Sequence, residues 1–253
     1  MLDWVAHNSR PRAIPKSFVP MSQSINRFYF PPISAADENG LLLLGGELTP
    51  AILLEAYRLG IFPWPIVNQN LELLAWFSPD PRAVIELNQF RVSRRLARRI
   101  RSGIYNVTID TAFEQVIRGC ARPRNGENGV WITEKLVKAY CQMYDFGHAH
   151  SVEVWHENEL VGGLYGIAIG GVFAGESMFH RMRDASKVAM TYLVDHLKHR
   201  GYQLFDIQQS TSHSVRLGAT ELMRGEFLRR LKKATGASVT FGDQLETSLP
   251  SAT

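Results

Sequence analysis

One carboxylate, Glu176, lies in a stretch of the sequence that is otherwise apolar. Val172 and Phe173 precede it, and Met178 and Phe179 follow it. A carboxylate in such surroundings is costly to bury unless it has a partner or a chemical task. The stretch therefore indicates either a functional carboxylate in the core or, as the plainer alternative, a glutamate on an edge strand that faces water.

A second polar pair interrupts a short apolar strand predicted at 204–208. Because side chains alternate along a strand, Asp206 and Gln208 share one face, and Phe205 and Ile207 share the other. If this strand neighbours the strand of Glu176, three polar side chains converge at one place. A carboxylate or a polarised amide there could accept a proton or a hydrogen bond from a reacting amine.

The elements that must position these residues follow from the hydrophobic pattern. The segments 149–155, 160–169 and 172–179 read as consecutive antiparallel strands separated by turns. A helix at about 184–199, with a buried apolar face, then leads to the strand at 204–208. The sequence thus predicts a sheet in which a helix separates the two polar strands.

The N-terminal third reads as a smaller unit. A helix is predicted from Thr49, a capping residue, to Gly60. The aromatic, proline-fixed segments 61–65 and 76–82 are predicted to be loops that pack between domains or form a wall of a substrate cleft. We place the boundary near residue 85. This gives an N-terminal domain of residues 1–85, forming one wall of the cleft, and a second domain of residues 86–253 whose tail, from about residue 235, is expected to be flexible.

Positive charge is concentrated in one short segment. The net charge of the chain is +4, yet residues 91–101 alone contain six arginines and no acid. A helix predicted at 90–104 buries Leu96 and Ile100 and leaves the arginines on its other faces. Like charges four residues apart repel each other, and a phosphate backbone would relieve that repulsion. The segment predicts contact with a nucleic acid, although a solvated helix face is the simpler alternative.

Composition excludes several other classes of protein. The chain of 253 residues is 45% hydrophobic and 21% charged, which is typical of a soluble globular protein. Neither a signal peptide nor an apolar run long enough to span a bilayer is evident, so we expect a cytoplasmic protein without a membrane partner. Cys120 and Cys141 are expected to be reduced thiols. His148, His150 and His156 lack the further ligands of a metal site, so no metal is expected.

Eight motifs in one order resemble the leucyl/phenylalanyl-tRNA–protein transferases, over about residues 28–230. They are Asn39 to Leu42, Gly60 to Trp64, Trp76 to Arg82, Trp131 to Thr133, Gly147 to Ser151, Gly162 to Gly166, Gly175 to Phe179 and Asp206 to Gln208. The resemblance implies an α+β fold, with a small N-terminal domain joined to a mixed-sheet domain of the acetyltransferase (GNAT-like) type. It implies an enzyme that transfers Leu or Phe, with Met as a further candidate, from aminoacyl-tRNA to the N-terminal amine of proteins beginning with Arg or Lys. The product would feed the bacterial N-end degradation pathway. The resemblance implies no cofactor, and we expect a monomer.

The same resemblance assigns roles residue by residue. It places Glu176, Asp206 and Gln208 at the catalytic positions and Trp64 and Trp131 at positions that hold the tRNA 3′ end and substrate. Leu164, Phe173 and Met178 match the apolar pocket for the aminoacyl side chain. The tRNA-binding region corresponds in character to the basic segment, with Arg91, Arg94, Arg95, Arg98, Arg99 and Arg101.

Two other readings of the sequence stay open. A coenzyme A-dependent acetyltransferase would need a glycine-rich pyrophosphate cradle at the strand-to-helix turn, and residues 181–187 contain no glycine. A non-catalytic RNA-binding protein would account for the arginines but not for the three polar residues on the predicted strands. Which group accepts the proton also stays open: Gln208 oriented by Asp206, or Asp206 itself.

Overall fold

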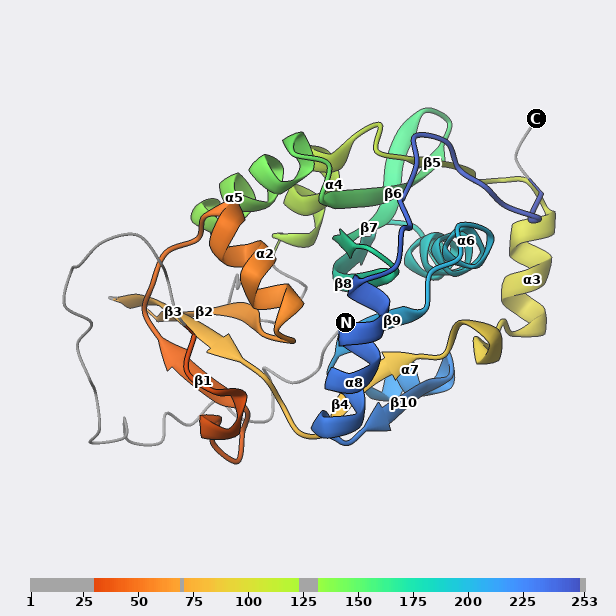
Figure 1. Cartoon of the computed structure of the whole chain (residues 1–253). Coiled ribbons are helices and arrows are strands. Elements are labelled where there is room, and N and C mark those ends of the chain that lie inside the picture. Colours follow the sequence, from red (N-terminus) through yellow and green to blue (C-terminus); the bar gives the residue numbers. More distant parts are fainter. Residues whose placement is uncertain (1–29, 69–70, 123–131, 251–253) are drawn as a thin grey trace.

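The computed structural model describes residues 30–68, 71–122 and 132–250 (Figure 1). The N-terminal part forms a three-stranded antiparallel sheet in the order β1-β3-β2, with β1 (Leu41–Leu44), β2 (Phe62–Asn68) and β3 (Leu71–Phe77). The short helix η1 (Ile33–Ala35) precedes β1. Helix α2 (Pro50–Arg58) follows it, and it begins as predicted, because the Thr49 hydroxyl accepts a hydrogen bond from the Ile52 backbone N–H.

The larger sheet has seven strands in the order β10-β4-β9-β8-β7-β6-β5. These strands are β4 (Arg82–Ile85), β5 (Asn106–Ile109), β6 (Ala149–His156), β7 (Glu159–Ile169), β8 (Val172–His180), β9 (Leu204–Gln208) and β10 (Ala219–Leu222). The expected antiparallel succession of β6, β7 and β8 is confirmed. The expected α+β class, with a small N-terminal unit beside a larger mixed sheet, is also confirmed.

The pairing of β8 with β9 is parallel and short. It joins three residue pairs, from Val172 with Leu204 to Ala174 with Asp206. Beyond these pairs, β8 continues to His180 and β9 to Gln208 without pairing to each other. The sheet is therefore open at its middle, at the level of Glu176 and Gln208.

Helices cover both faces of this sheet. Helix α6 (Ala185–His199) connects β8 to β9 and packs on one face, with α3 (Arg94–Arg101) beside it (Figure 1). The opposite face carries α4 (Phe113–Cys120), α5 (Glu134–Asp145) and α8 (Arg224–Thr235). The short helices η2 (Leu87–Gln89) and α7 (Ser212–Arg216) complete the described elements.

Two glycines of β7 permit this close packing. A Cβ atom on Gly162 would lie 2.6 Å from the Cβ of Ala185 at the start of α6. A Cβ atom on Gly166 would lie 2.3 Å from the carbonyl oxygen of Ala174 on β8. The glycine-rich character of this strand thus reflects the approach of a helix and a neighbouring strand.

The N-terminal unit and the large sheet share one apolar core. Tyr57, Phe62 and Trp76 belong to the same buried cluster as Ile117 and Tyr140 of α4 and α5. Strand β4, which a boundary at residue 85 assigns to the N-terminal domain, pairs within the seven-stranded sheet. The division of the chain into domains at residue 85 stays a prediction.

The aromatic segments predicted to be loops include strands. Residues 62–68 and 71–77 form the antiparallel pair β2 and β3. The prolines of this segment, Pro63 and Pro65, lie on β2, which is an edge strand within the described sheet. An edge strand tolerates proline because one side of it makes no ladder hydrogen bonds, and this explains why proline content was misleading here.

The expectation of a flexible tail is wrong for residues 236–250. Phe241 is only 2% exposed, and its ring stacks on His150 and Phe173 at centroid distances of 4.2 and 5.6 Å. The ring of His196 accepts a hydrogen bond from the Glu246 N–H through Nδ1 and therefore donates from Nε2 to the Phe241 carbonyl oxygen. Because small polar residues dominate the tail, its sequence did not indicate that Phe241 anchors it to the core.

Replacement of Phe241 by alanine should lower the free energy of unfolding by about 3–5 kcal/mol, because it removes a buried aromatic ring. Phe146→Ala is the matched control, since Phe146 is 67% exposed and its loss should change stability by less than about 0.5 kcal/mol. Urea unfolding of the two variants measures the difference. Equal stabilities would contradict the packing of the tail.

Candidate active site

Glu176 lies at an irregularity in the pairing of β7 with β8. Tyr165 pairs with Ser177 and Gly166 pairs with Gly175, so Glu176 is an extra residue without an opposite partner. Such a bulge redirects a side chain out of the regular alternation. It places a carboxylate of a central strand at the opening between β8 and β9.

Three polar groups surround the Glu176 carboxylate. The Tyr140 hydroxyl donates to Oε2 at 2.9 Å, and the Gln208 side-chain amide donates from Nε2 to Oε1 at 3.1 Å. The hydroxyl of Tyr57, from α2, makes a short hydrogen bond to that of Tyr140. Both ends of the carboxylate are therefore held, one by the helical layer and one by the end of β9.

The protonation of Glu176 is finely balanced. Its side chain is buried, and burial raises its pKa to about 7. The hydrogen bonds of Tyr57 and Tyr140 act against this rise by favouring the carboxylate. Burial likewise raises the pKa of both tyrosines far above the ordinary value, so they act as neutral hydrogen-bond donors.

Asp206 is held by a buried arginine. The Arg82 guanidinium donates from Nε to Oδ1 at 2.9 Å and from Nη2 to Oδ2 at 2.7 Å. Asp206 Oδ1 also accepts the backbone N–H of Gln208 at 3.0 Å. Arg82 and Asp206 are 1% and 3% exposed, so this ion pair lies in the interior.

Gln208 ends β9 and connects the two carboxylates. Its backbone has a φ of +58°, a left-handed conformation that a non-glycine residue rarely adopts. The hydrogen bond from its N–H to Asp206 supports that conformation, and its side chain reaches Glu176. The three polar residues predicted to converge therefore do meet, with Gln208 in the middle.

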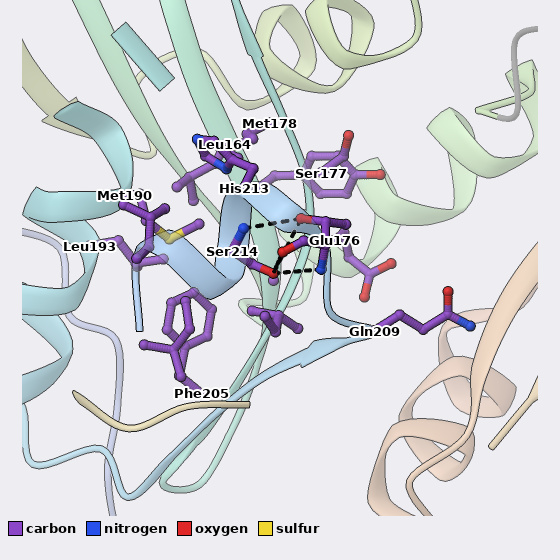
Figure 2. Close-up of a pocket in the computed structure, with 16 residues that line it drawn as sticks. Leu164, Glu176, Ser177, Met178, Met190, Leu193, Phe205, Gln209, His213 and Ser214 are labelled. Carbon is purple, nitrogen blue, oxygen red and sulfur yellow. Dashed lines mark hydrogen bonds between the residues drawn. The ribbon is translucent and has the colours of Figure 1, made fainter. Parts of the chain in front are cut away.

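A cavity adjoins this network on the α6 side of the sheet (Figure 2). It holds about 550 Å³, including its open mouth, and Glu176, Gln209 and His213 lie among its polar lining residues. Its apolar wall comprises Ile85, Leu164, Met178, Met190, Leu193, Phe205, Ile207 and Leu217. The cavity is suited to an apolar group attached to a polar one.

Two of the three predicted pocket residues line the cavity, and the third does not. Leu164 and Met178 line the cavity. Phe173 lies behind it: this residue is fully buried, and its ring packs edge-on against Phe205, at a centroid distance of 5.8 Å. Phe173 therefore acts on the cavity wall through Phe205.

Of the two tryptophans predicted to hold the tRNA 3′ end, the structure describes one. Trp64 lies on β2 and packs, half-buried, against the cluster that contains Tyr57 and Tyr140. This places it on the N-terminal side of the Glu176 network. Trp131 lies outside the described residues.

The predicted arginine helix is present. It is shorter than expected, and one of its arginines is paired with an acid. Helix α3 begins at Arg94, so Arg91 precedes it. Leu96 and Ile100 are buried as predicted, and Arg94, Arg98 and Arg101 are exposed. Arg95 donates to Asp184, at the start of α6, at 3.2 Å. An acid distant in sequence thus partly neutralises a run that has no acid of its own.

Sequence reasoning missed four residues of the site: Arg82, Tyr57, Tyr140 and His213. Arg82 was visible as a motif residue, but its partner lies 124 positions away. The tyrosines occupy apolar helix positions and read as core. His213 lies on α7 at the cavity, where burial lowers its pKa to about 4.

The turn between β8 and α6 bears on the acetyltransferase alternative. A coenzyme A pyrophosphate would need the N-terminal N–H groups of α6. Asp184 occupies the N-cap position with its carboxylate 3% exposed. This carboxylate is paired with Arg95 and Lys187, so its charge is compensated, and the argument against coenzyme A rests on the absence of glycine from the turn.

Neither a metal site nor a membrane span occurs among the described residues. Residues 30–68, 71–122 and 132–250 contain no group of three histidine, cysteine or acidic side chains arranged to hold a metal ion. Within the same ranges, no helix has the length and apolar character needed to cross a membrane.

Comparison with known proteins identifies the family. The family model "Leucyl/phenylalanyl-tRNA protein transferase" matches residues 84–232, and the model of the N-terminal domain of the same family matches residues 46–80. Among solved structures, a GCN5-related N-acetyltransferase-like protein from Streptococcus suis is 11% identical. That match covers 68% of this chain and 63% of the other, with a TM-score of 0.30.

Curated relatives carry the same name as the family models. A leucyl/phenylalanyl-tRNA–protein transferase of Syntrophotalea carbinolica is 52% identical over 217 residues, which are 85% of this chain and 93% of that protein. Its counterpart in Pseudomonas entomophila is 49% identical over 215 residues, 83% of this chain and 94% of the relative. This chain therefore belongs to the leucyl/phenylalanyl-tRNA–protein transferase family and is an aminoacyltransferase.

Proposed function

We propose that the enzyme moves Leu or Phe from aminoacyl-tRNA to the N-terminal amine of proteins that begin with Arg or Lys, and that it also accepts Met. The observation that carries this proposal is the pair of hydrogen bonds of Gln208: its backbone N–H donates to Asp206, and its side-chain amide donates to Glu176, which lines the apolar cavity. In this arrangement the cavity takes the aminoacyl side chain, and the amide lies at the reacting ester.

The cavity supports the choice of donor. Leu164, Met178 and Met190 offer an apolar surface with flexible thioethers. An unbranched or γ-branched side chain such as Met, Leu or Phe would fill it, whereas a β-branched side chain would fit less well. Discrimination by the shape of an apolar pocket is worth about 1–3 kcal/mol.

The reaction requires little chemistry from the protein. The acceptor nitrogen attacks the ester carbonyl carbon, the bond to the ribose oxygen breaks, and the amine proton ends on that oxygen. The enzyme must therefore position the amine and stabilise the tetrahedral oxyanion. Gln208 Oε1 would accept a hydrogen bond from the attacking amine, and the Glu176 carboxylate would bind the α-ammonium of the donor or the acceptor N-terminus.

The contacts of Asp206 support Gln208 over Asp206 as the acceptor of the amine hydrogen bond. Both Asp206 oxygens are engaged, by Arg82 and by the Gln208 N–H. By contrast, no described residue donates to Gln208 Oε1, and the side-chain amide is held through Nε2. In this mechanism Asp206 orients Gln208.

Three further properties belong to the proposal. The exposed arginines of α3 contact the tRNA, and Trp64 and Trp131 hold its 3′ end and the substrate. The enzyme works as a monomer in the cytoplasm. The modified proteins enter the bacterial N-end degradation pathway.

Removal of the Gln208 amide should abolish most of the transfer. With radiolabelled Leu-tRNA and a peptide beginning with Arg, Gln208→Ala should lower kcat by roughly 100-fold, the typical loss of one transition-state hydrogen bond. Gln203→Ala, an exposed glutamine at the start of the same segment, is the control and should retain the wild-type rate.

Asp206→Asn separates the two candidate proton acceptors. It should slow transfer less than Gln208→Ala does, because Asp206 acts only through Gln208. The reverse order would assign the acceptor role to Asp206, and full activity of Asp206→Asn would remove Asp206 from the mechanism. Absence of transfer by the wild type with Leu-, Phe- or Met-tRNA would refute the proposed function.

The raised pKa of Glu176 predicts opposite pH dependences for stability and activity. This pKa is about 7 in the folded enzyme, against an ordinary value of 4.5 for a glutamate. Between these values the folded state binds more protons than the unfolded state, so the free energy of unfolding falls as pH rises from 4.5 to 7. The expected loss is about 3 kcal/mol, and Glu176→Gln should lack it.

Activity should rise over the same range, because only the carboxylate binds an ammonium well. The wild-type rate should therefore show a limb near pH 7, separate from the titration of the acceptor amine at about 7.7–8.0. Chemical denaturation and initial rates at each pH, with Glu176→Gln as the reference, measure both effects. Parallel pH profiles for wild type and variant would contradict the assignment.

The exposed arginines of α3 predict a salt-dependent RNA affinity. Arg94→Gln together with Arg98→Gln should weaken tRNA binding and reduce the slope of log K against log salt by about 1 for each arginine that neutralises a phosphate. Arg118→Gln is the control, since Arg118 is on α4 and paired with Glu114 and Glu134. Equal affinities and slopes for both proteins, measured by fluorescence anisotropy, would exclude α3 from the interface.

A further inference from the structure

The guanidinium of Arg82 is the most completely enclosed charged group of the site. Its plane lies between the rings of Phe62 and Phe227, at 4.8 and 4.7 Å from their centroids. Its edge makes the two bonds to Asp206, and Nη1 donates to the Gly60 carbonyl oxygen at 3.1 Å. The guanidinium thus has an acidic partner, a carbonyl partner and two aromatic partners.

These partners come from parts of the chain that are far apart in sequence. Gly60 lies in the turn after α2, three residues beyond Tyr57, which belongs to the Glu176 network. Asp206 supports Gln208 from the opposite side. Arg82 therefore connects the segment that carries Tyr57 with the segment that carries Gln208.

We propose that Arg82 is a positioning residue for the transfer reaction. It fixes the Asp206 carboxylate, which in turn fixes the left-handed conformation of Gln208 and the place of its amide. Through Gly60 it sets how far that amide lies from the Tyr57–Tyr140–Glu176 branch. This inference rests on the proposed function, because the amide of Gln208 is the group whose position matters.

The shape of the site demands a guanidinium and no other cation. Two parallel N–H groups match the two oxygens of Asp206, and a flat ion fits between two aromatic rings. A lysine ammonium carries the same charge but would bond to one oxygen and leave the gap between the rings unfilled. A buried Asp206 held at one point could rotate and release the Gln208 N–H.

The test uses full-length enzyme with Arg82→Lys and Arg82→Gly. Because misplacement of a reacting group by about 1 Å can cost roughly 100-fold in rate, Arg82→Lys should lower kcat by roughly 10- to 100-fold. The KM values for Leu-tRNA and for the acceptor peptide should stay near those of the wild type. Low millimolar guanidinium chloride should restore part of the kcat of Arg82→Gly, and sodium chloride at equal concentration should not.

Arg224→Lys and Arg224→Gly are the matched controls. Arg224 also fastens distant segments, but it does so by donating to the carbonyl oxygens of Ile33 and Ser78 rather than to Asp206. Its loss should lower thermal stability without changing kcat in the folded fraction, and guanidinium should have no effect on kcat.

A double-mutant cycle adds a second test. It measures the coupling between Arg82 and Asp206 in kcat, which a purely structural role of Arg82 would not produce. In the Asp206→Asn background, Arg82→Lys should cost much less in kcat than it does alone, because the group it positions has already been altered. If Arg82→Gly does not fold, this cycle and the Arg82→Lys kinetics decide the question.

The outcomes distinguish this inference from the proposed function. A wild type without transfer activity refutes the proposed function. An active wild type with Arg82→Lys within twofold of its kcat, or with losses that parallel those of Arg224→Lys, overturns only the role of Arg82.

Discussion

Two carboxylates buried at the opening between β8 and β9 impose the main constraint on this structure. A charge in the interior must be compensated by partners within hydrogen-bond distance. Asp206 receives a full guanidinium, whereas Glu176 receives only neutral donors and keeps a pKa of about 7. Because those partners belong to α2, α5 and β4, the site can form only when the N-terminal unit is docked on the large sheet.

The arrangement has two sides, and Glu176 belongs to both. The apolar cavity is on the side of α6, and the hydrogen-bonded network faces α5 and the N-terminal sheet. Glu176 lines the cavity and is also held by Tyr140 and Gln208 of the network.

The local sequence pattern predicted those helices and strands that depend on local interactions. Alternation and turn signals located β6 to β9 and α6, and the anomaly of a carboxylate among apolar residues located Glu176. The ion pair of Arg82 was beyond reach, because a charged residue next to a proline-rich loop carries no sign of burial. Tyr140 was hidden for the opposite reason, since a tyrosine on an apolar helix face is indistinguishable from core. Phe241 shows the same limit for the tail, where one aromatic among small polar residues decided the packing.

The shared core of the N-terminal unit and the large sheet has a consequence for the modularity of the family. One family model ends at residue 80 and the other begins at residue 84, which divides the protein into two pieces. A fragment beginning at residue 84 would lose Arg82, leave Asp206 as an uncompensated interior charge, and expose the apolar surface that Phe62 and Trp76 cover. The two pieces therefore depend on each other for a compensated Asp206 and for a covered core.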